Sequence, residues 1–505
     1  MPHILLTTLN ARYIHSAFGL RYLYANMEEL QPQTDIVEFN INQRAIDIVE
    51  TLLENKPQII GLGVYIWNVE ETTKVVALLK QIAPHITLIL GGPEVSHEHD
   101  QQQIVRLADY VICGTADRGF AKLCRQIIHG PQPLMKIHPA DSSDLSELAL
   151  PYAYYNDEDI RNRVIYVEAS RGCPFKCEFC ISSLDKTAVP FELDLFLSEM
   201  DKLYQRGVRH FKFVDRTFNL KIENSARIME FFLERMGEDA PLFLHFELIP
   251  DHLPERLKEI IARFPKGSLQ FEVGVQSFNP EVQQLISRKQ NEQKTCDNLR
   301  WLRQESHAHL HTDLILGLPG EDLASIAAGF DKLVALNPHE IQVGILKRLR
   351  GTPIIRHTEA HHMRYTPHAP YSVLATDKLD FNTLQRLNRF ARYWDMIANS
   401  GRFSHTLPLL LNEHPFNNFM SLSDWIFQQG KQTHKIALPR LFELLYFGML
   451  TLPNVDSQAL QQQIMKDFDA SPIKGRAKFL AHNENTSEKS HRQQSNSRQS
   501  RHLAS

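Results

Sequence analysis

This chain of 505 residues has little of what marks secreted, membrane-spanning or nucleic-acid-binding proteins. Its six cysteines are too few for a disulfide framework. Its formal net charge of −4 gives no electrostatic reason to expect nucleic acid or a membrane as a partner. No apolar run approaches the ~18 residues that span a bilayer. The first residues, MPHILLTTLN, also lack the basic and apolar regions of a signal peptide. We therefore expect a cytoplasmic protein with reduced thiols.

Residues 1–137 alternate short apolar runs with amphipathic stretches of helical character. Near-continuous apolar strands separated by helices are typical of a parallel sheet covered on both faces. In flavodoxin-like order, such a sheet binds ligands beyond the C-terminal ends of its strands. Glycines cluster at those ends, where they let a bulky ligand approach backbone amides. The predicted strands are 3–9, 35–41, 58–66, 86–92 and 108–114, and the glycines are Gly61, Gly63, Gly91, Gly92 and Gly114.

The rest of the chain divides into four further segments. Residues 138–162, which include a stretch rich in Ser, Asp and Pro, are expected to form a linker. Residues 163–355 repeat the strand–helix pattern six times, which predicts a partial barrel that is open where an eight-unit barrel would close. Residues 356–479 are predicted to form an α-helical domain, and residues 480–505 a polar, disordered tail. The predicted barrel strands are 163–170, 210–215, 242–248, 268–277, 309–318 and 340–346.

Three of the six cysteines lie close together directly after the first predicted barrel strand. Cys173, Cys177 and Cys180 form a C-x3-C-x2-C pattern within EASRGCPFKCEFC. Thiolates are soft ligands, and three on one loop can hold a single metal centre. On a [4Fe–4S] cluster, three ligands leave one iron open for the amino and carboxylate groups of S-adenosylmethionine (SAM). The alternatives are buried thiols or a zinc site, although tetrahedral zinc favours paired CxxC spacing and a fourth Cys or His close by.

The segment SRGCPFKCEFC resembles the signature of the radical SAM superfamily. The segments HFELIPDHL, FEVGVQSFNPEVQQLISRKQ and DLILGLPGE resemble one branch of it, which includes oxygen-independent coproporphyrinogen oxidases and cobalamin-binding radical SAM proteins. The resemblance covers about residues 1–355. It implies an α/β fold in which a flavodoxin-like (Rossmann-like) domain precedes a partial (βα)6 barrel. It also implies that a [4Fe–4S] cluster cleaves SAM to a 5′-deoxyadenosyl radical.

The same resemblance implies roles for residues near the ends of the barrel strands. Glu247 would bind the SAM amino group, and Arg288 would pair with its carboxylate. Gln276 and Asp313 would hold the ribose hydroxyls, and Gly317 in the GLPGE turn would let the backbone approach the adenosine. Taken singly, each has an ordinary alternative, such as a surface arginine or a strand-end aspartate. After the second strand, Asp215-Arg216-Thr217 replaces the glycine-rich turn of many superfamily members.

The N-terminal segment LILGGPEVS is similar to the GGP turn of the cobalamin (B12)-binding domain that precedes this class of barrel. The resemblance implies that Gly91, Gly92 and Gly114 lie close to cobalamin. The usual last turn of that domain, GEGExxF, is here GTADRGF (114–120), and no DxHxxG motif supplies a histidine to cobalt. A vestigial domain that only packs is the alternative.

These resemblances imply a cobalamin-dependent enzyme that methylates an unactivated carbon of a small-molecule substrate. A rearrangement, a ring closure or a non-catalytic cobalamin or redox sensor would use the same parts. A methylthiotransferase is disfavoured because the N-terminal domains of those enzymes carry three cysteines, whereas here there are only Cys113 and Cys124. An electron donor such as flavodoxin or ferredoxin is expected as a partner, and no nucleic acid or membrane.

Histidines of the barrel region leave two interpretations open. His307, His309 and His311 alternate, so they share a face of the strand with Asp313. They either form interior hydrogen bonds or bind substrate and transfer protons. The cluster at residues 357–362 has no recognisable ligand spacing.

Overall fold

The computed structural model describes residues 3–54, 56–139, 144–237, 241–473 and 477. The chain divides into two compact units, Met1–Asp395 and Met396–Ser505. The tail predicted for residues 480–505 and part of the predicted linker, residues 140–143, lie outside the described residues. Among the helices that are described, none combines the length and the apolar character needed to cross a membrane.

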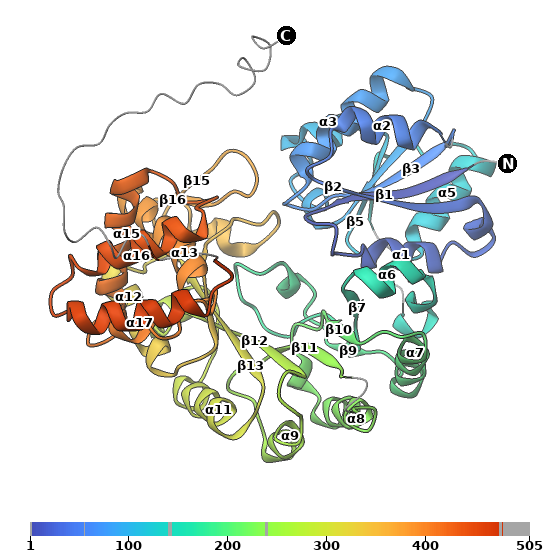
Figure 1. Ribbon diagram of the computed structural model, residues 1–505. Coiled ribbons are helices and arrows are strands. Elements are labelled where there is room, and N and C mark those ends of the chain that lie inside the picture. The colour runs from blue at the N-terminus through green and yellow to red at the C-terminus, as the bar shows by residue number, and fades with distance from the viewer. Residues whose placement is uncertain (1–2, 55, 140–143, 238–240, 474–476, 478–505) are drawn as a thin grey trace, which may run out of the picture. The chain divides into compact units, whose positions relative to one another are not determined.

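The first unit begins with a parallel sheet of six strands in the order β2-β1-β3-β4-β5-β6 (Figure 1). Its strands are β1 (Ile4–Asn10), β2 (Thr34–Asn40), β3 (Ile59–Gly63), β4 (Thr87–Gly91), β5 (Tyr110–Cys113) and β6 (Ile137–Pro139). The predicted flavodoxin-like order of the first five strands is confirmed. Because the order reverses between β1 and β3, the ligand-binding edge of this sheet is where these two strands end.

Apolar cores on both faces of this sheet explain its buried strands. All seven residues of β1 are buried. Helices α2 (Ala45–Glu54), α3 (Val69–Ile82) and α4 (Gln103–Leu107) pack on one face, and α1 (Phe18–Ala25) and α5 (Gly119–His129) pack on the other. The sixth strand, β6, was not predicted, because three residues at a sheet edge that end in proline carry no strand pattern.

The barrel sheet has the order β14-β13-β12-β11-β10-β7. Its strands are β7 (Ile165–Val167), β10 (His210–Phe213), β11 (Phe243–Leu248), β12 (Leu269–Gln276), β13 (His309–Leu316) and β14 (Glu340–Ile345). All six predicted strands are present, and β7 is the most shortened, with three residues. Buried and half-buried residues alternate strictly along β12 and β13. Along β12 the buried side chains are apolar, and the polar ones share the opposite face. Along β13 Thr312 is buried with the leucines, and Ile315 shares the half-buried face with the polar side chains.

Helices lie along the outside of the barrel strands (Figure 1). They are α7 (Leu193–Gln205), α8 (Ile222–Leu233), α9 (Glu255–Ile261), α10 (Pro280–Leu285), α11 (Glu292–Glu305) and α12 (Leu323–Ala335). After β14 come a 3₁₀ helix, η8 (Pro353–His357), and a hairpin of β15 (Arg364–Tyr365) and β16 (Val373–Ala375). The hairpin lies in a segment for which only helices were predicted. Helix α13 (Phe381–Ile397) then packs Phe390 and Trp394 against Phe330 of α12.

The second unit is helical, as predicted. Its helices are α14 (Leu407–Leu410), α15 (Pro415–Gly430), α16 (Leu438–Met449) and α17 (Ser457–Asp469). The ring of Phe442 packs against the rings of Phe403 and Phe468. The buried carboxylate of Asp467 accepts hydrogen bonds from the backbone amides of His405 and Thr406, which ties α17 to the start of α14.

Candidate active site

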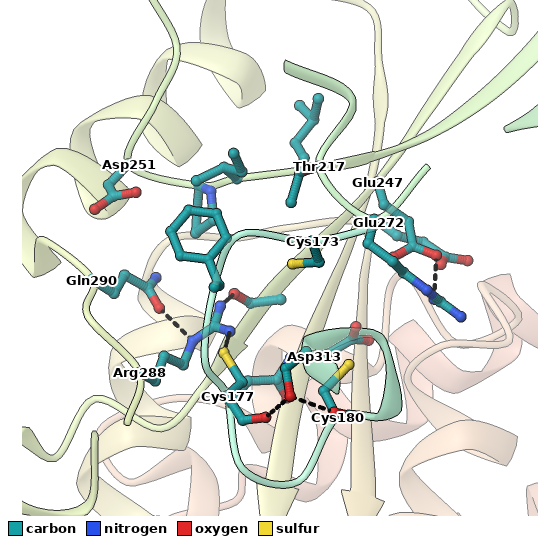
Figure 2. A pocket seen from close by; sticks show the side chains of 18 of the residues that line it. Cys173, Cys177, Cys180, Thr217, Glu247, Asp251, Glu272, Arg288, Gln290 and Asp313 are labelled. Carbon is teal, nitrogen blue, oxygen red and sulfur yellow. Dashed lines mark hydrogen bonds and ion pairs between the residues drawn. The ribbon is translucent and has the colours of Figure 1, made fainter. Parts of the chain in front are cut away.

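A cavity of about 360 Å³ lies at the C-terminal ends of the barrel strands (Figure 2). The loop after β7 contributes the three motif cysteines. Strands β11, β12 and β13 and the turn after α10 contribute the residues predicted to bind SAM. The structure thus brings together Cys173, Cys177, Cys180, Glu247, Gln276, Arg288 and Asp313 in one lining.

Backbone geometry holds the cysteine loop in place. Cys173 and Cys177 are free thiols with 8% and 7% exposure, and Cys180 is half-buried. The Ser183 hydroxyl lies 2.9 Å from the Cys177 carbonyl oxygen and 2.7 Å from that of Cys180. Gly172 has φ +87°, and a Cβ there would lie 2.5 Å from the Thr187 carbonyl oxygen, so the loop requires glycine before its first cysteine.

Three free thiols on one loop line the cavity, and this is the ligand set that a [4Fe–4S] cluster with one open iron needs. Within the described part of the chain, no three His, Cys, Asp or Glu side chains are arranged to hold one metal ion. A zinc site needs its ligands to converge at about 2.0–2.3 Å from one point. A [4Fe–4S] cluster binds each thiolate at a different iron, so its cysteines stand farther apart around a cavity. Burial raises the pKa of the Cys173 thiol, and coordination to iron would keep it deprotonated.

Two oppositely charged side chains line the cavity and could bind the amino and carboxylate groups of an amino acid. Glu247 accepts a hydrogen bond at 2.6 Å from Arg216, a residue of the segment that replaces the usual glycine-rich turn. The Arg288 guanidinium donates to Gln290 at 3.0 Å and to the Gly274 carbonyl oxygen, and its Nη1 lies 3.5 Å from Cys177 Sγ. A carboxylate acceptor and a guanidinium donor in one cavity match an amino and a carboxylate group.

Gln276 and Asp313 carry polar groups that a ligand would satisfy. The side-chain oxygen of Gln276 is buried without a hydrogen-bond partner, and its backbone has φ +72°, which is rare for a residue other than glycine. A buried acceptor without a donor costs about 1–3 kcal/mol, so a ligand hydroxyl here would be stabilised. Burial raises the pKa of Asp313 to about 7, and the charges of Glu272 and Glu247 add to this effect.

Gly317 is not among the residues that line the cavity. It has φ +84°, and a Cβ there would lie 2.5 Å from Val373 Cγ1. The structure therefore explains this glycine by close packing against β16. Its predicted contact with adenosine stays a prediction.

The barrel interior next to the cavity is polar. Glu272 lies 2.8 Å from His245 Nε2 and 3.2 Å from Lys212 Nζ. Burial alone would raise the pKa of Glu272, but the bond from His245 and the Lys212 charge outweigh it and lower the pKa to about 2. His309 lies 2.8 Å from Glu340, and His311 lies 3.6 Å from Asp313. His309 and His311 thus each lie beside a carboxylate, and a substrate role for them stays a prediction. His307, the third predicted histidine, is exposed and precedes β13, so it does not share this face.

A second cavity, of about 290 Å³, lies at the ligand-binding edge of the N-terminal sheet. Its lining includes Gly91 and Gly92 but not Gly114, whose amide donates to Ser96 Oγ at 3.0 Å. Gly92 has φ +108°, and a Cβ there would lie 2.5 Å from the Val64 carbonyl oxygen. A Cβ at Gly91 would meet no protein atom closer than 4.0 Å. Gly92 is thus required by the Val64 backbone, whereas Gly91 leaves open space at the edge where a cobalamin-binding domain holds its ligand.

A histidine in the loop that follows β1 does not line this cavity. His15, in the loop between β1 and α1, lies with Nδ1 2.7 Å from the Tyr166 hydroxyl of β7. None of the residues described as lining the second cavity is a histidine. This geometry agrees with the absence of a DxHxxG motif.

Sequence reasoning missed the polar wall of the second cavity. The Arg171 guanidinium binds Asp117 at 2.7 Å and Glu168 at 2.8 Å, and it stacks 4.4 Å from the centre of the Tyr22 ring. All four residues line that cavity. Asp117 stands where the usual turn has glutamate, and Arg171 belongs to the SRGC segment. Their places in these two motifs could have indicated a role at the cavity, but only the structure shows that the two side chains form an ion pair.

Three family models match the chain. The B12 binding domain matches residues 4–124, the Radical SAM superfamily matches residues 167–333, and a protein of unknown function (DUF4080) matches residues 359–504. The cobalamin-dependent radical SAM methyltransferase TokK of Streptomyces tokunonensis is 24% identical over 337 residues, which is 58% of this chain and 47% of that protein. The uncharacterized methyltransferase PH0819 of Pyrococcus horikoshii is 22% identical over 69% of this chain and 79% of that protein.

Solved structures share the fold. TsrM from Kitasatospora setae, a radical SAM methyltransferase solved with cobalamin and a [4Fe–4S] cluster bound, superposes with a TM-score of 0.59 at 16% identity, over 93% of this chain and all of that one. The cobalamin-dependent SAM radical enzyme OxsB superposes with a TM-score of 0.60 at 12% identity, over 93% of this chain and 80% of that one. This chain spans about half the length of TokK. By its matched family models, the chain combines a B12 binding domain and a Radical SAM domain with a C-terminal DUF4080 domain.

Proposed function

We propose that this protein is a cobalamin-dependent radical SAM methyltransferase that acts on an unactivated carbon of a small molecule. The observation that carries the proposal is the barrel cavity. It combines three free cysteines with a carboxylate, a guanidinium and an unpartnered amide oxygen. The similarity to TokK, a cobalamin-dependent radical SAM methyltransferase, supports methyl transfer as the reaction class.

The residues of the cavity would divide the work as follows. Cys173, Cys177 and Cys180 would hold the [4Fe–4S] cluster. Glu247 would accept from the SAM amino group and Arg288 would donate to its carboxylate. These contacts would fix the orientation of SAM, and orienting such cofactors is the main contribution of the protein to their chemistry. When bound, the cluster, SAM and cobalamin together supply the electron, the radical and the methyl group.

The remaining side chains would set the surroundings of the reaction. Gln276 and Asp313 would hold the ribose. Glu272, which lines the cavity and pairs with His245, would give the cavity a polar wall for the substrate. At the second cavity, the Gly91-Gly92 turn would admit cobalamin, and the ion pair between Arg171 and Asp117 would fix the wall beside it.

Partners are part of the proposal. A small molecule is proposed as substrate. Reduction of the cluster requires an electron donor, for which a flavodoxin or ferredoxin is proposed. With a net charge of −4, the chain has no bulk positive charge to attract nucleic acid.

The test begins with the protein purified without oxygen. Iron, sulfide and cobalamin are measured, and the protein is then reduced with dithionite in the presence of SAM. About four irons per chain, bound corrinoid and formation of 5′-deoxyadenosine would support the proposal. SAM carrying a labelled methyl group, incubated with cell extract, would reveal methyl transfer.

Other outcomes would overturn parts of it. Cluster and corrinoid that leave SAM intact would favour a cobalamin or redox sensor. Cleavage of SAM without transfer of label to any extract component would favour a rearrangement or ring closure. Zinc in place of iron would end the radical SAM assignment of this chain's chemistry.

A further inference from the structure

One buried carboxylate lies inside the cysteine motif itself. Glu178, between Cys177 and Cys180, is 2% exposed. Its Oε1 accepts from Ser287 Oγ at 2.5 Å and from the Arg356 guanidinium, and its Oε2 lies 2.8 Å from His357 Nε2. Its backbone amide donates to the Ile286 carbonyl oxygen at 3.0 Å. A carboxylate is rarely this buried unless it is paired, and here both oxygens have partners.

These bonds join three segments that are far apart in the sequence. The first is the cysteine loop, the second is the turn after α10, and the third is η8. Besides the side-chain bonds, the amide of Ile354 in η8 donates to the Glu178 carbonyl oxygen at 3.0 Å. The cysteine loop is therefore held from two sides by one residue.

The turn after α10 is also the one that carries Arg288. Ser287 has φ +54°, an uncommon conformation for serine that needs support from its surroundings. The Arg288 amide donates to the Gln283 carbonyl oxygen at 2.8 Å. The Arg288 guanidinium then reaches within 3.5 Å of Cys177 Sγ. The bond between Glu178 and Ser287 thus fixes the backbone from which Arg288 extends.

We infer that Glu178 is a positioning residue that sets Arg288 relative to the cysteines through Ser287, so that SAM is held in register with the cluster. The inference rests on the proposed function. Arg288 touches the ligand and Glu178 does not. Arg356 and His357 pair with the buried carboxylate, whereas Ser287 links it to the turn that carries Arg288. Displacement of a reacting group by about 1 Å can cost 10²-fold in rate, so this indirect contact matters.

The decisive variant is Ser287→Ala, because it removes only one bond and leaves the carboxylate paired with Arg356 and His357. We expect iron content and the spectrum of the oxidised cluster to match wild type. The KM for SAM, measured by 5′-deoxyadenosine formation, should rise about 10-fold, with a smaller change in kcat. The change that SAM causes in the electron paramagnetic resonance spectrum of the reduced cluster should require correspondingly more SAM.

Two further variants and a control complete the test. Glu178→Ala should reproduce the rise in KM, and Glu178→Gln, which keeps an acceptor for Ser287, should restore much of it. Glu359→Gln, at an exposed glutamate shortly after η8, should behave as wild type. The inference would be overturned if Ser287→Ala had the wild-type KM for SAM and needed no more SAM than wild type to change the electron paramagnetic resonance spectrum. If the wild-type protein itself bound no iron or did not cleave SAM, the proposed function, on which the inference rests, would be overturned instead.

Discussion

Arg350 and Glu94 are 256 residues apart in the sequence and form a buried ion pair, with Nε 2.8 Å from Oε1. The Tyr371 hydroxyl donates to the same carboxylate oxygen at 2.7 Å. Arg350 also binds Glu98 at 2.8 Å, a carboxylate shared with Arg348. Glu94 follows the Gly91-Gly92 turn, and Arg350 follows β14. The pair therefore connects the loop beside the second cavity to the barrel.

Removal of this arginine should destabilise the first unit strongly. Arg350→Met leaves Glu94 buried with a lost charge partner, which typically costs about 3–5 kcal/mol in the free energy of unfolding. Urea denaturation followed by tryptophan fluorescence measures the change. Arg44→Met is the matched control, because the Arg44–Asp47 pair is exposed at 77% and 48% and such pairs contribute about 0–1 kcal/mol. Equal losses in the two variants would contradict the prediction.

Serine substitutions at a motif cysteine and at a cysteine outside the motif should affect the iron content differently. Cys177→Ser should lose most of the iron and the visible absorption of the cluster, because serine is a poor ligand for it. Cobalamin binding should persist, because the second cavity contains none of the motif cysteines. Iron analysis and a spectrum of the corrinoid check both expectations. Cys296→Ser, at a buried cysteine of α11, should keep its iron. Loss of iron in both variants would contradict this assignment.

Two neighbouring glycines should respond differently to alanine. Gly91→Ala should fold normally, because its Cβ would meet no protein atom closer than 4.0 Å, yet it should weaken cobalamin binding by filling the cavity. Gly92→Ala should lower the unfolding temperature as well, because its Cβ would lie 2.5 Å from the Val64 carbonyl oxygen and its φ is +108°. Thermal unfolding and equilibrium titration with hydroxocobalamin separate the two effects. Unchanged cobalamin affinity in Gly91→Ala would place the ligand elsewhere.

Stability should depend on pH through Glu321. Burial raises its pKa to about 7, although Ser277 donates to it, and its Oε2 is buried without a hydrogen-bond partner. The unfolded pKa is about 4.3, so the folded protein holds this proton more tightly. The stabilisation is complete below about pH 4 and is lost as pH rises to about 7.

The variant Glu321→Gln isolates this effect. Between pH 5 and pH 8 the wild type should lose about 2–3 kcal/mol more unfolding free energy than the variant does. Asp313 and Asp215 also have raised pKa values, but they are present in both proteins and cancel in the comparison. Urea denaturation at the two pH values measures the difference. Parallel losses would show that Glu321 ionises normally.

The sequence predicted what local patterns encode. Short apolar runs and alternating apolar residues mark the strands of both sheets that the sequence predicted, and the C-x3-C-x2-C spacing marks the loop that lines the barrel cavity. The sequence did not reveal β6 or the β15–β16 hairpin, because strands of two or three residues carry no periodicity. Nor did it reveal the partners of Glu178 and Arg350, because ion pairs between distant segments leave no local pattern.

The bonds of Glu178 have a consequence for biosynthesis. Its partner His357 is 179 residues further along the chain. At about 5–20 residues per second, a ribosome needs roughly ten seconds or more to add them. During that time the thiols of the emerging polypeptide lack the segments that later enclose them. Cluster insertion into a finished site must therefore follow translation of η8, and the nascent cysteines depend on the reducing state of their surroundings until then.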